Sequence, residues 1–281
     1  MQRIVQGLAA TLQHTFYSDG VAADPSPATA TVTITRDDGT DVVTSQAATR
    51  LSAGVFTYTV TPIHTVLLDT WTVGWTATFG GQSQTFEDIV EVAGGPLFTL
   101  AEARSLKPLD SLTAYPTAAI VEARTMVETA LENACGVAFV PRYGREIVSG
   151  DGTTTLMLVP RLRSIRSVSV DGVPIAAPSL AGIKVLSSGV AYNPAWWAGG
   201  FANLEIAYEH GHDFPPPRVS QAALLWAKNF LVKGPIDDRT TSVVSEDGTF
   251  ALSTPGMRGA TTGIPEVDAV ISQYSLQVGI A

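Results

Sequence analysis

The sequence predicts a multidomain protein: an all-β sandwich at residues 1–93, an α+β domain at 97–233 and a C-terminal arm at 234–281. Three observations predict this order. In the first part, apolar residues alternate with threonine at a period of two, which is the pattern of half-buried strands. The Gly-Gly-Pro run at 94–96 is a candidate linker. After it, apolar residues recur at three- and four-residue steps, as in amphipathic helices.

The predicted strands of the first part are short, rich in β-branched residues and separated by glycine turns. They span 28–34, 55–61, 70–79 and 86–92, with weaker ones at 11–16 and 42–46. In the 70–79 strand, Trp71 and Trp75 share one face, which we expect to be buried. About seven strands in about 90 residues favour an immunoglobulin-like sandwich. The Cys–Trp–Cys hallmark of antibody domains is absent, so only the architecture is predicted.

The second part combines helices with a small β region. Thr99 and Glu102 have the spacing of a capping box, which predicts a short helix to about residue 106. A longer amphipathic helix should run from 116 to 133 and end at Gly136, and another should span 218–232. Between these two helices, the predicted strands lie at 145–149, 155–159, 164–175, 185–192 and 203–208.

The C-terminal arm combines a polar segment with a short helix. Residues 234–263 show no period, and a loop of that length is usually functional or disordered. A last helix can begin at Pro265. Its narrow apolar stripe is typical of a partner-docking helix and consists of Val267, Val270, Ile271 and Tyr274.

Composition restricts the classes of protein to which the chain can belong. The net charge is −9, with 15% charged and 45% hydrophobic residues, so we expect much of the surface to be covered by partners. No apolar run approaches the roughly 18 residues of a membrane span, and the N-terminus lacks a signal peptide. We therefore expect assembly in the cytoplasm and no membrane contact. An acidic balance disfavours sequence-independent nucleic-acid binding as the main task.

Candidate catalytic or metal-binding residues are few. His210 and His212, flanked by Glu209 and Asp213, could ligate a metal, but a polar loop with local hydrogen bonds explains them better. His14 and His64 lie in the sandwich, where structural roles are expected. Cys135 ends an apolar helix and is better explained as a small buried hydrophobe than as a nucleophile. The sequence therefore predicts no enzyme, no cofactor and no metal.

Five arginines lie close together in the second β region, with only Glu146 and Asp151 as nearby acids: Arg142, Arg145, Arg161, Arg163 and Arg166. We favour a solvated face or a face with intersubunit salt bridges. The alternative is a phosphate-facing surface, which would matter if the protein surrounds DNA.

Residues 97–281 resemble the head-to-tail adaptor proteins (head completion or connector proteins) of long-tailed bacteriophages. The resemblance is carried by an ordered series rather than by one motif. The series runs from the short helix at 99–106 through the helix ending at 132–136, the Val-Pro-Arg-Tyr segment at 140–143, the β region at 158–172 and the segment 208–217 to the helix at 218–232.

The resemblance implies a structural role in the virion neck. Adaptors of this family form a ring, usually dodecameric, beneath the portal; the ring extends the DNA channel and presents a surface to the stopper or tail-completion protein. It implies that residues 234–281 contact the portal or a neighbour and that packaged DNA is touched non-specifically. The sandwich departs from the short form of the family and would project outward.

The alternative function is a surface binding module, in which the sandwich recognises a host surface or a carbohydrate. Exposed aromatic residues suited to sugar stacking are not evident in the sandwich sequence. The Trp196-Trp197 pair in the second part is better explained as packing in a loop or an interface.

Overall fold

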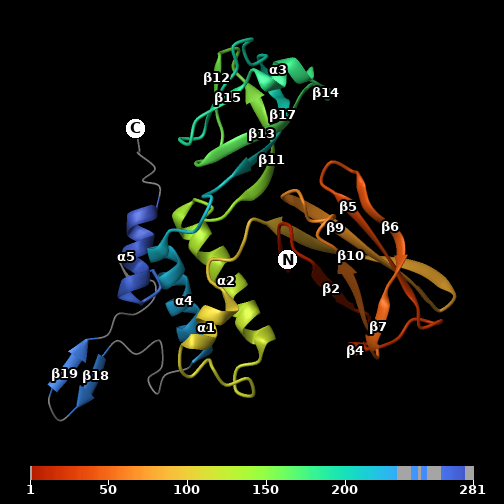
Figure 1. Cartoon of the computed structure of the whole chain (residues 1–281), viewed down its shortest axis with the longest axis vertical. Helices are drawn as coiled ribbons and strands as arrows, with labels where there is room; N and C mark the ends of the chain where they lie inside the picture. The colour runs from red at the N-terminus through yellow and green to blue at the C-terminus, as the bar shows by residue number, and fades with distance from the viewer. Residues whose placement is uncertain (1, 233–241, 246–247, 252–260, 276–281) are drawn as a thin grey trace. The chain divides into compact units, whose positions relative to one another are not determined.

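The computed structural model describes residues 2–232, 242–245, 248–251 and 261–275 (Figure 1). By their contacts, the residues form two compact units. Unit 1 contains Met1–Gly95, Pro141–Leu158 and Leu162–His210, and unit 2 contains Pro96–Val140, Val159–Arg161 and Gly211–Ala281. The second β region therefore lies in the same unit as the N-terminal strands, while the predicted domain boundaries stay a prediction.

The N-terminal part of unit 1 is a two-sheet sandwich. One sheet has the order β1 (Gln2–Val5), β10 (Gln82–Ala93), β9 (Asp69–Phe79), β5 (Ala30–Arg36) and β6 (Asp41–Ala47). The other has the order β2 (Ala10–Thr15), β8 (Val55–Val60) and β7 (Thr49–Ser52), beside the short pair β3 (Tyr17–Ser18) and β4 (Val21–Ala22). Within the two main sheets all strand pairs are antiparallel except β1, which runs parallel to β10.

Alternating side chains of both sheets form the sandwich core. Strand β9 alternates between buried and half-buried residues, as its threonine pattern predicts, and both Trp71 and Trp75 are buried. From the second sheet, Leu12, Phe56 and Val60 pack into the same cluster. The predicted sandwich is confirmed, whereas its immunoglobulin-like type stays a prediction. Strand β1 was not predicted, because four residues are too few to show a period.

The second β region contains two small sheets. The first has the order β11 (Arg142–Gly150), β17 (Gly200–His210), β13 (Leu162–Val170) and β14 (Val173–Pro174). The second has the order β12 (Thr155–Met157), β16 (Val190–Tyr192) and β15 (Lys184–Val185), and the one-turn helix α3 (Ala177–Ala181) was not predicted. The register shifts in the pairing of β11 with β17 and in the pairing of β13 with β17, as at β-bulges.

Unit 2 is helical: α1 (Leu100–Ser105), α2 (Thr117–Cys135), α4 (Pro217–Leu231) and α5 (Pro265–Tyr274). Both parts of the predicted capping box are present, with the Thr99 hydroxyl accepting from the Glu102 amide and the Glu102 carboxylate accepting from the Thr99 amide. Gly136 ends α2 with φ of 67°, the left-handed conformation that glycine adopts without strain. In Figure 1, α2, α4 and α5 lie side by side, and their apolar faces share one core.

The predicted structureless segment at 234–263 contains two short strands. β18 (Ser242–Ser245) and β19 (Gly248–Ala251) form an antiparallel hairpin, so the prediction was wrong for these residues. Strands of four residues are too short to show a clear period in the sequence. The rest of the predicted loop, apart from residues 261–263, lies outside the described residues, as does the segment after 275.

Candidate functional site

The five clustered arginines do not form one unpaired basic surface, because three of them make ion pairs within unit 1. The acids come from distant parts of the sequence, so the count of nearby acids underestimated the available partners. Arg142, Arg145 and Arg166 each contact a residue of the sandwich. These contacts join the sandwich to the sheet of β11, β17 and β13.

Glu91 on β10 is the most buried acid of this set, at 7% exposure. One of its carboxylate oxygens forms ion pairs with Nη1 of Arg142 at 2.6 Å and with Nε of Arg3 at 3.0 Å. Arg3 on β1 is the register partner of Glu91, so the parallel pairing places the two side chains together. Burial raises the pKa of Glu91, but the attraction of Arg142 and Arg3 outweighs it, and the pKa lies below its ordinary value.

Arg145 and Tyr143 on β11 both reach Asp37, which follows β5. Nη1 of Arg145 donates to the Asp37 carbonyl at 2.5 Å, and its Nη2 lies 2.5 Å from a Glu205 oxygen. The Tyr143 hydroxyl donates to the Asp37 carboxylate at 2.9 Å. Burial and this carboxylate raise the pKa of Tyr143, so the phenol stays protonated and a donor at neutral pH.

Arg166 on β13 makes the third connection. Its Nε donates to Glu209 at 2.8 Å, its Nη1 donates to the Leu68 carbonyl at 2.5 Å, and its guanidinium lies 5.3 Å from the centre of the Tyr143 ring. Arg163 is half-buried on the same strand, while Arg161 belongs to unit 2, is exposed and has a positive φ of 60°. A channel-facing or intersubunit role of the cluster stays a prediction.

The apolar stripe of the last helix lies in the core of unit 2. Val267 is fully buried, Val270 and Ile271 are nearly so, and Tyr274 packs edge-on against Phe139. These side chains therefore contact α2 and α4 of the same chain rather than solvent. Contact of the stripe with the portal or a neighbour would require α5 to leave this core, and that role stays a prediction.

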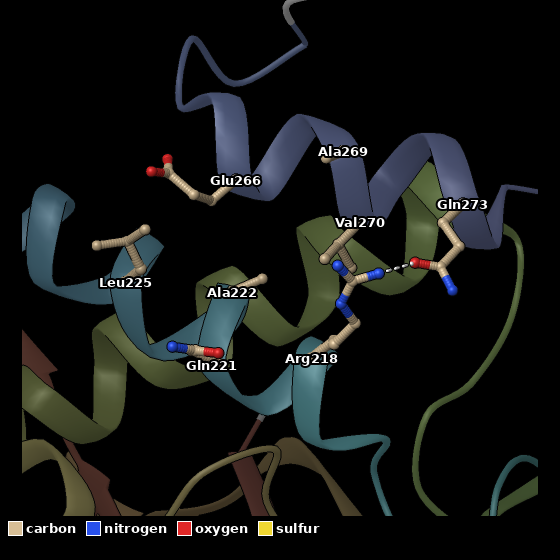
Figure 2. Close-up of a pocket in the computed structure, with 8 residues that line it drawn as sticks. All are labelled: Arg218, Gln221, Ala222, Leu225, Glu266, Ala269, Val270 and Gln273. Atoms are coloured by element: carbon tan, nitrogen blue, oxygen red, sulfur yellow. Dashed lines mark hydrogen bonds between the residues drawn. The ribbon is translucent and has the colours of Figure 1, made fainter.

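A cavity of about 300 Å³ lies between α4 and α5 (Figure 2). Its walls are apolar near Ala222, Leu225 and Val270, and Arg218 at one end donates to the Gln273 amide oxygen at 3.0 Å. Glu266 lines the same cavity from the first turn of α5. None of the residues that line this cavity is a nucleophile beside a base.

His210 and His212 lie on different units and have different surroundings. His210 ends β17, and burial followed by the Arg142 charge lowers its pKa. His212 stacks on Phe139 at 5.8 Å, and burial followed by the Arg161 charge lowers its pKa too. Across the described residues, no group of three or more His, Cys, Asp or Glu side chains is placed to hold a metal ion.

Large exposed apolar side chains recur through the second β region. Phe201 is 95% exposed at the start of β17, and Trp196 is 64% exposed in the loop before it, whereas its neighbour Trp197 is buried. Other exposed members of the region are Ile147, Met157, Val173 and Leu186. None of the helices in the described part of the chain is long and apolar enough to span a membrane.

The comparisons with known proteins give distant structural likenesses alone. No protein-family model and no curated protein matches the chain. Among solved structures, a chain of the "Virion of native gene transfer agent (GTA) particle" is similar, with a TM-score of 0.45 and 14% identity, over 66% of this chain and 93% of that one. At this TM-score the likeness gives no information on function.

Proposed function

We propose that this chain is a non-enzymatic structural protein of the bacteriophage neck. It forms a homo-oligomeric ring, expected to be a dodecamer, under the portal protein. The ring joins the DNA-filled head to the tail, extends the DNA channel and binds the stopper or tail-completion protein below. Its place is the portal vertex of the virion, after assembly in the host cytoplasm. The ordered series of segments at 97–281 is the source of this proposal.

The observation that supports the proposal is the number of large exposed apolar side chains in the second β region. A single exposed apolar side chain is common on the surface of a monomer. Several large ones in one region, such as Phe201 and Trp196, are typical of a subunit interface. The low charge content of the chain agrees with a surface that partners cover. Aromatic residues of this size are also the most frequent energetic anchors of interfaces.

The test is assembly of the full chain, followed by sedimentation velocity and negative-stain imaging. The wild-type protein should form rings alone or on purified portal rings, and a Phe201→Ser/Trp196→Ser variant should sediment as a smaller species with unchanged circular dichroism. Ile63→Ser is the matched control, because Ile63 is 75% exposed in the sandwich. A wild-type chain that stays monomeric and ignores portal rings would overturn the proposal.

The DNA-channel part of the proposal has its own test. Arg161 is exposed, so Arg161→Glu should leave the ring intact and reduce DNA retention in assembled particles. Lys107→Glu is a control with the same charge change at a site outside the arginine cluster. Loss of the ring itself in Arg161→Glu would favour the intersubunit role instead.

A further inference from the structure

Helix α5 is held in unit 2 mainly by apolar side-chain contacts with α2 and α4. The contacting side chains are the buried stripe described above: Val267, Val270, Ile271 and Tyr274. Among the described residues, the hydrogen bond from Arg218 Nη1 to the Gln273 amide oxygen, at 3.0 Å, is the one polar link between α4 and α5. The α2–α4 face therefore binds α5 through its apolar shape and not through a polar network.

The buried polar group of α5 has its partners close by in the chain. Asp268 is 9% exposed, and its carboxylate accepts hydrogen bonds from the Thr262 amide at 2.7 Å and from the Thr262 hydroxyl at 3.0 Å. The same hydroxyl accepts from the Ile264 amide at 3.2 Å. Residues 262–275 can therefore move together into an identical site without leaving Asp268 unpaired.

The connection between α4 and α5 is much longer than their packing requires. The two helices run in opposite directions, with Arg218 beside Gln273 and Leu225 across the cavity from Glu266 (Figure 2). The second half of α4 thus lies near the start of α5, and antiparallel helices placed in this way need connections of roughly 2–8 residues. Residues 232–264 connect them instead.

The extra length is enough to reach a second copy of the chain. Outside the hairpin β18–β19, the residues of this connection would span up to about 75 Å at full extension. A small helical domain is about 30 Å across. The α2–α4 face of an adjacent copy is therefore within reach of α5, and adjacency in an assembly raises the effective concentration of that face.

We propose that neighbouring copies exchange α5, so that α5 of each copy packs on α2 and α4 of the next. The structure identifies the occupant of this face, because α5 is seated on it with its stripe buried. Exchange of an identical element costs little, because the same contacts form in both arrangements. The inference rests on the proposed ring and names the contact that links its subunits. In a closed ring every copy donates one α5 and receives one, so no face is left uncovered.

Cross-linking of the full chain distinguishes exchange from packing within one copy. Arg218→Cys/Gln273→Cys places thiols where the two side chains now form a hydrogen bond, and a short bismaleimide joins them. In assembled rings, exchange predicts a ladder of covalent dimers, trimers and larger products in denaturing electrophoresis. Gln273→Cys alone is the matched control and should give no ladder, because the native Cys135 is buried.

The outcome separates this inference from the proposed function. Rings whose chains are cross-linked only internally, and run as monomers after denaturation, would overturn the exchange and leave the ring standing. A wild-type chain that forms no ring at all, alone or on portal rings, would overturn both.

Shortening the connection tests the exchange without changing either helix. Deletion of residues 235–259 leaves a connection that spans at most about 27 Å, which suffices for packing within one copy but falls short of the next. This variant should keep the circular dichroism of the wild type and lose the ring peak in sedimentation velocity. A Gly-Ser segment of equal length in place of residues 235–259 is the control and should keep the rings. Rings formed by the shortened variant would overturn the inference.

Discussion

Replacing Glu91 with glutamine removes the charge that two buried guanidinium groups share. Arg142 and Arg3 have side chains that are 5% and 10% exposed, so neither is well solvated when the carboxylate is gone. Removing one partner of a buried ion pair typically costs about 3–5 kcal/mol, because the remaining charge loses a favourable interaction in a low-dielectric environment. For a protein of this size, that corresponds to a fall in melting temperature of roughly 6–20 °C.

The pH dependence of this loss follows from the pKa of Glu91. Because its folded-state pKa lies below the ordinary value of 4.5, the ionised carboxylate stabilises the folded state at neutral pH. That contribution is fully present above pH 4.5 and is lost as the pH falls through the folded-state pKa. The melting temperatures of wild type and Glu91→Gln should therefore differ most at pH 7 and converge only below about pH 4.5.

Scanning calorimetry of both proteins between pH 7 and pH 3.5 measures the effect. The matched control is Glu205→Gln, since Glu205 pairs with Arg145 at the surface, where both side chains are about a third exposed. It should cost less than about 1 kcal/mol. If Glu91→Gln melts at the wild-type temperature at pH 7, or no lower than Glu205→Gln, the reasoning about the buried network is refuted.

Three further predictions concern unit 2. Burial, followed by the charge of Glu132, raises the pKa of Cys135 to about 11, so iodoacetamide at pH 8 should label the thiol only after denaturant is added, as mass spectrometry would show. Ile271→Ala should destabilise unit 2 by about 2–5 kcal/mol in urea unfolding, whereas Phe230→Ala should cost far less, because Ile271 is buried in the helical core and Phe230 is half exposed. Gly211→Ala should destabilise the protein by more than about 2 kcal/mol in the same assay, because φ is 102° and a Cβ would lie 2.1 Å from the Val140 carbonyl oxygen. Gly39 is the control: its φ is 83° and the space around it is open, so Gly39→Ala should show only the backbone strain of roughly 1–2 kcal/mol.

Sequence patterns predicted the elements that are determined by interactions between residues close together in the chain. The threonine alternation of β9 and the capping box of Thr99 and Glu102 are set by neighbours within a few residues, and the structure confirms both. Strand β1 depends instead on β10, some 88 positions away, so no local signal could reveal it. The same limit applies to the Val267 stripe: the sequence predicted contact with the portal or a neighbour, whereas the stripe packs on α2 and α4 of the same chain.

The ion-pair partners of the clustered arginines could not be identified from acids that are near them in the sequence. Counting acids near Arg145 finds Glu146, whose carboxylate instead accepts a hydrogen bond from Tyr208. The actual partners of Arg145 are Asp37, 108 positions earlier, and Glu205, 60 positions later. Strand pairing brings these groups together, so the basic character that the sequence suggests is largely compensated in the folded chain.

The ion pairs and hydrogen bonds of these arginines link the sandwich to the second β region. Unit 1 contains both the sandwich and the second β region, and the connections include Arg142 to Glu91, a pair that is buried on both sides. A deletion of residues 1–93 would expose Arg142 and remove the Leu68 carbonyl from Arg166, so the remaining strands should be less stable than in the full chain. The same deletion would remove all three contacts that Arg142, Arg145 and Arg166 make with the sandwich, so the loss of stability should exceed that of any single-arginine variant.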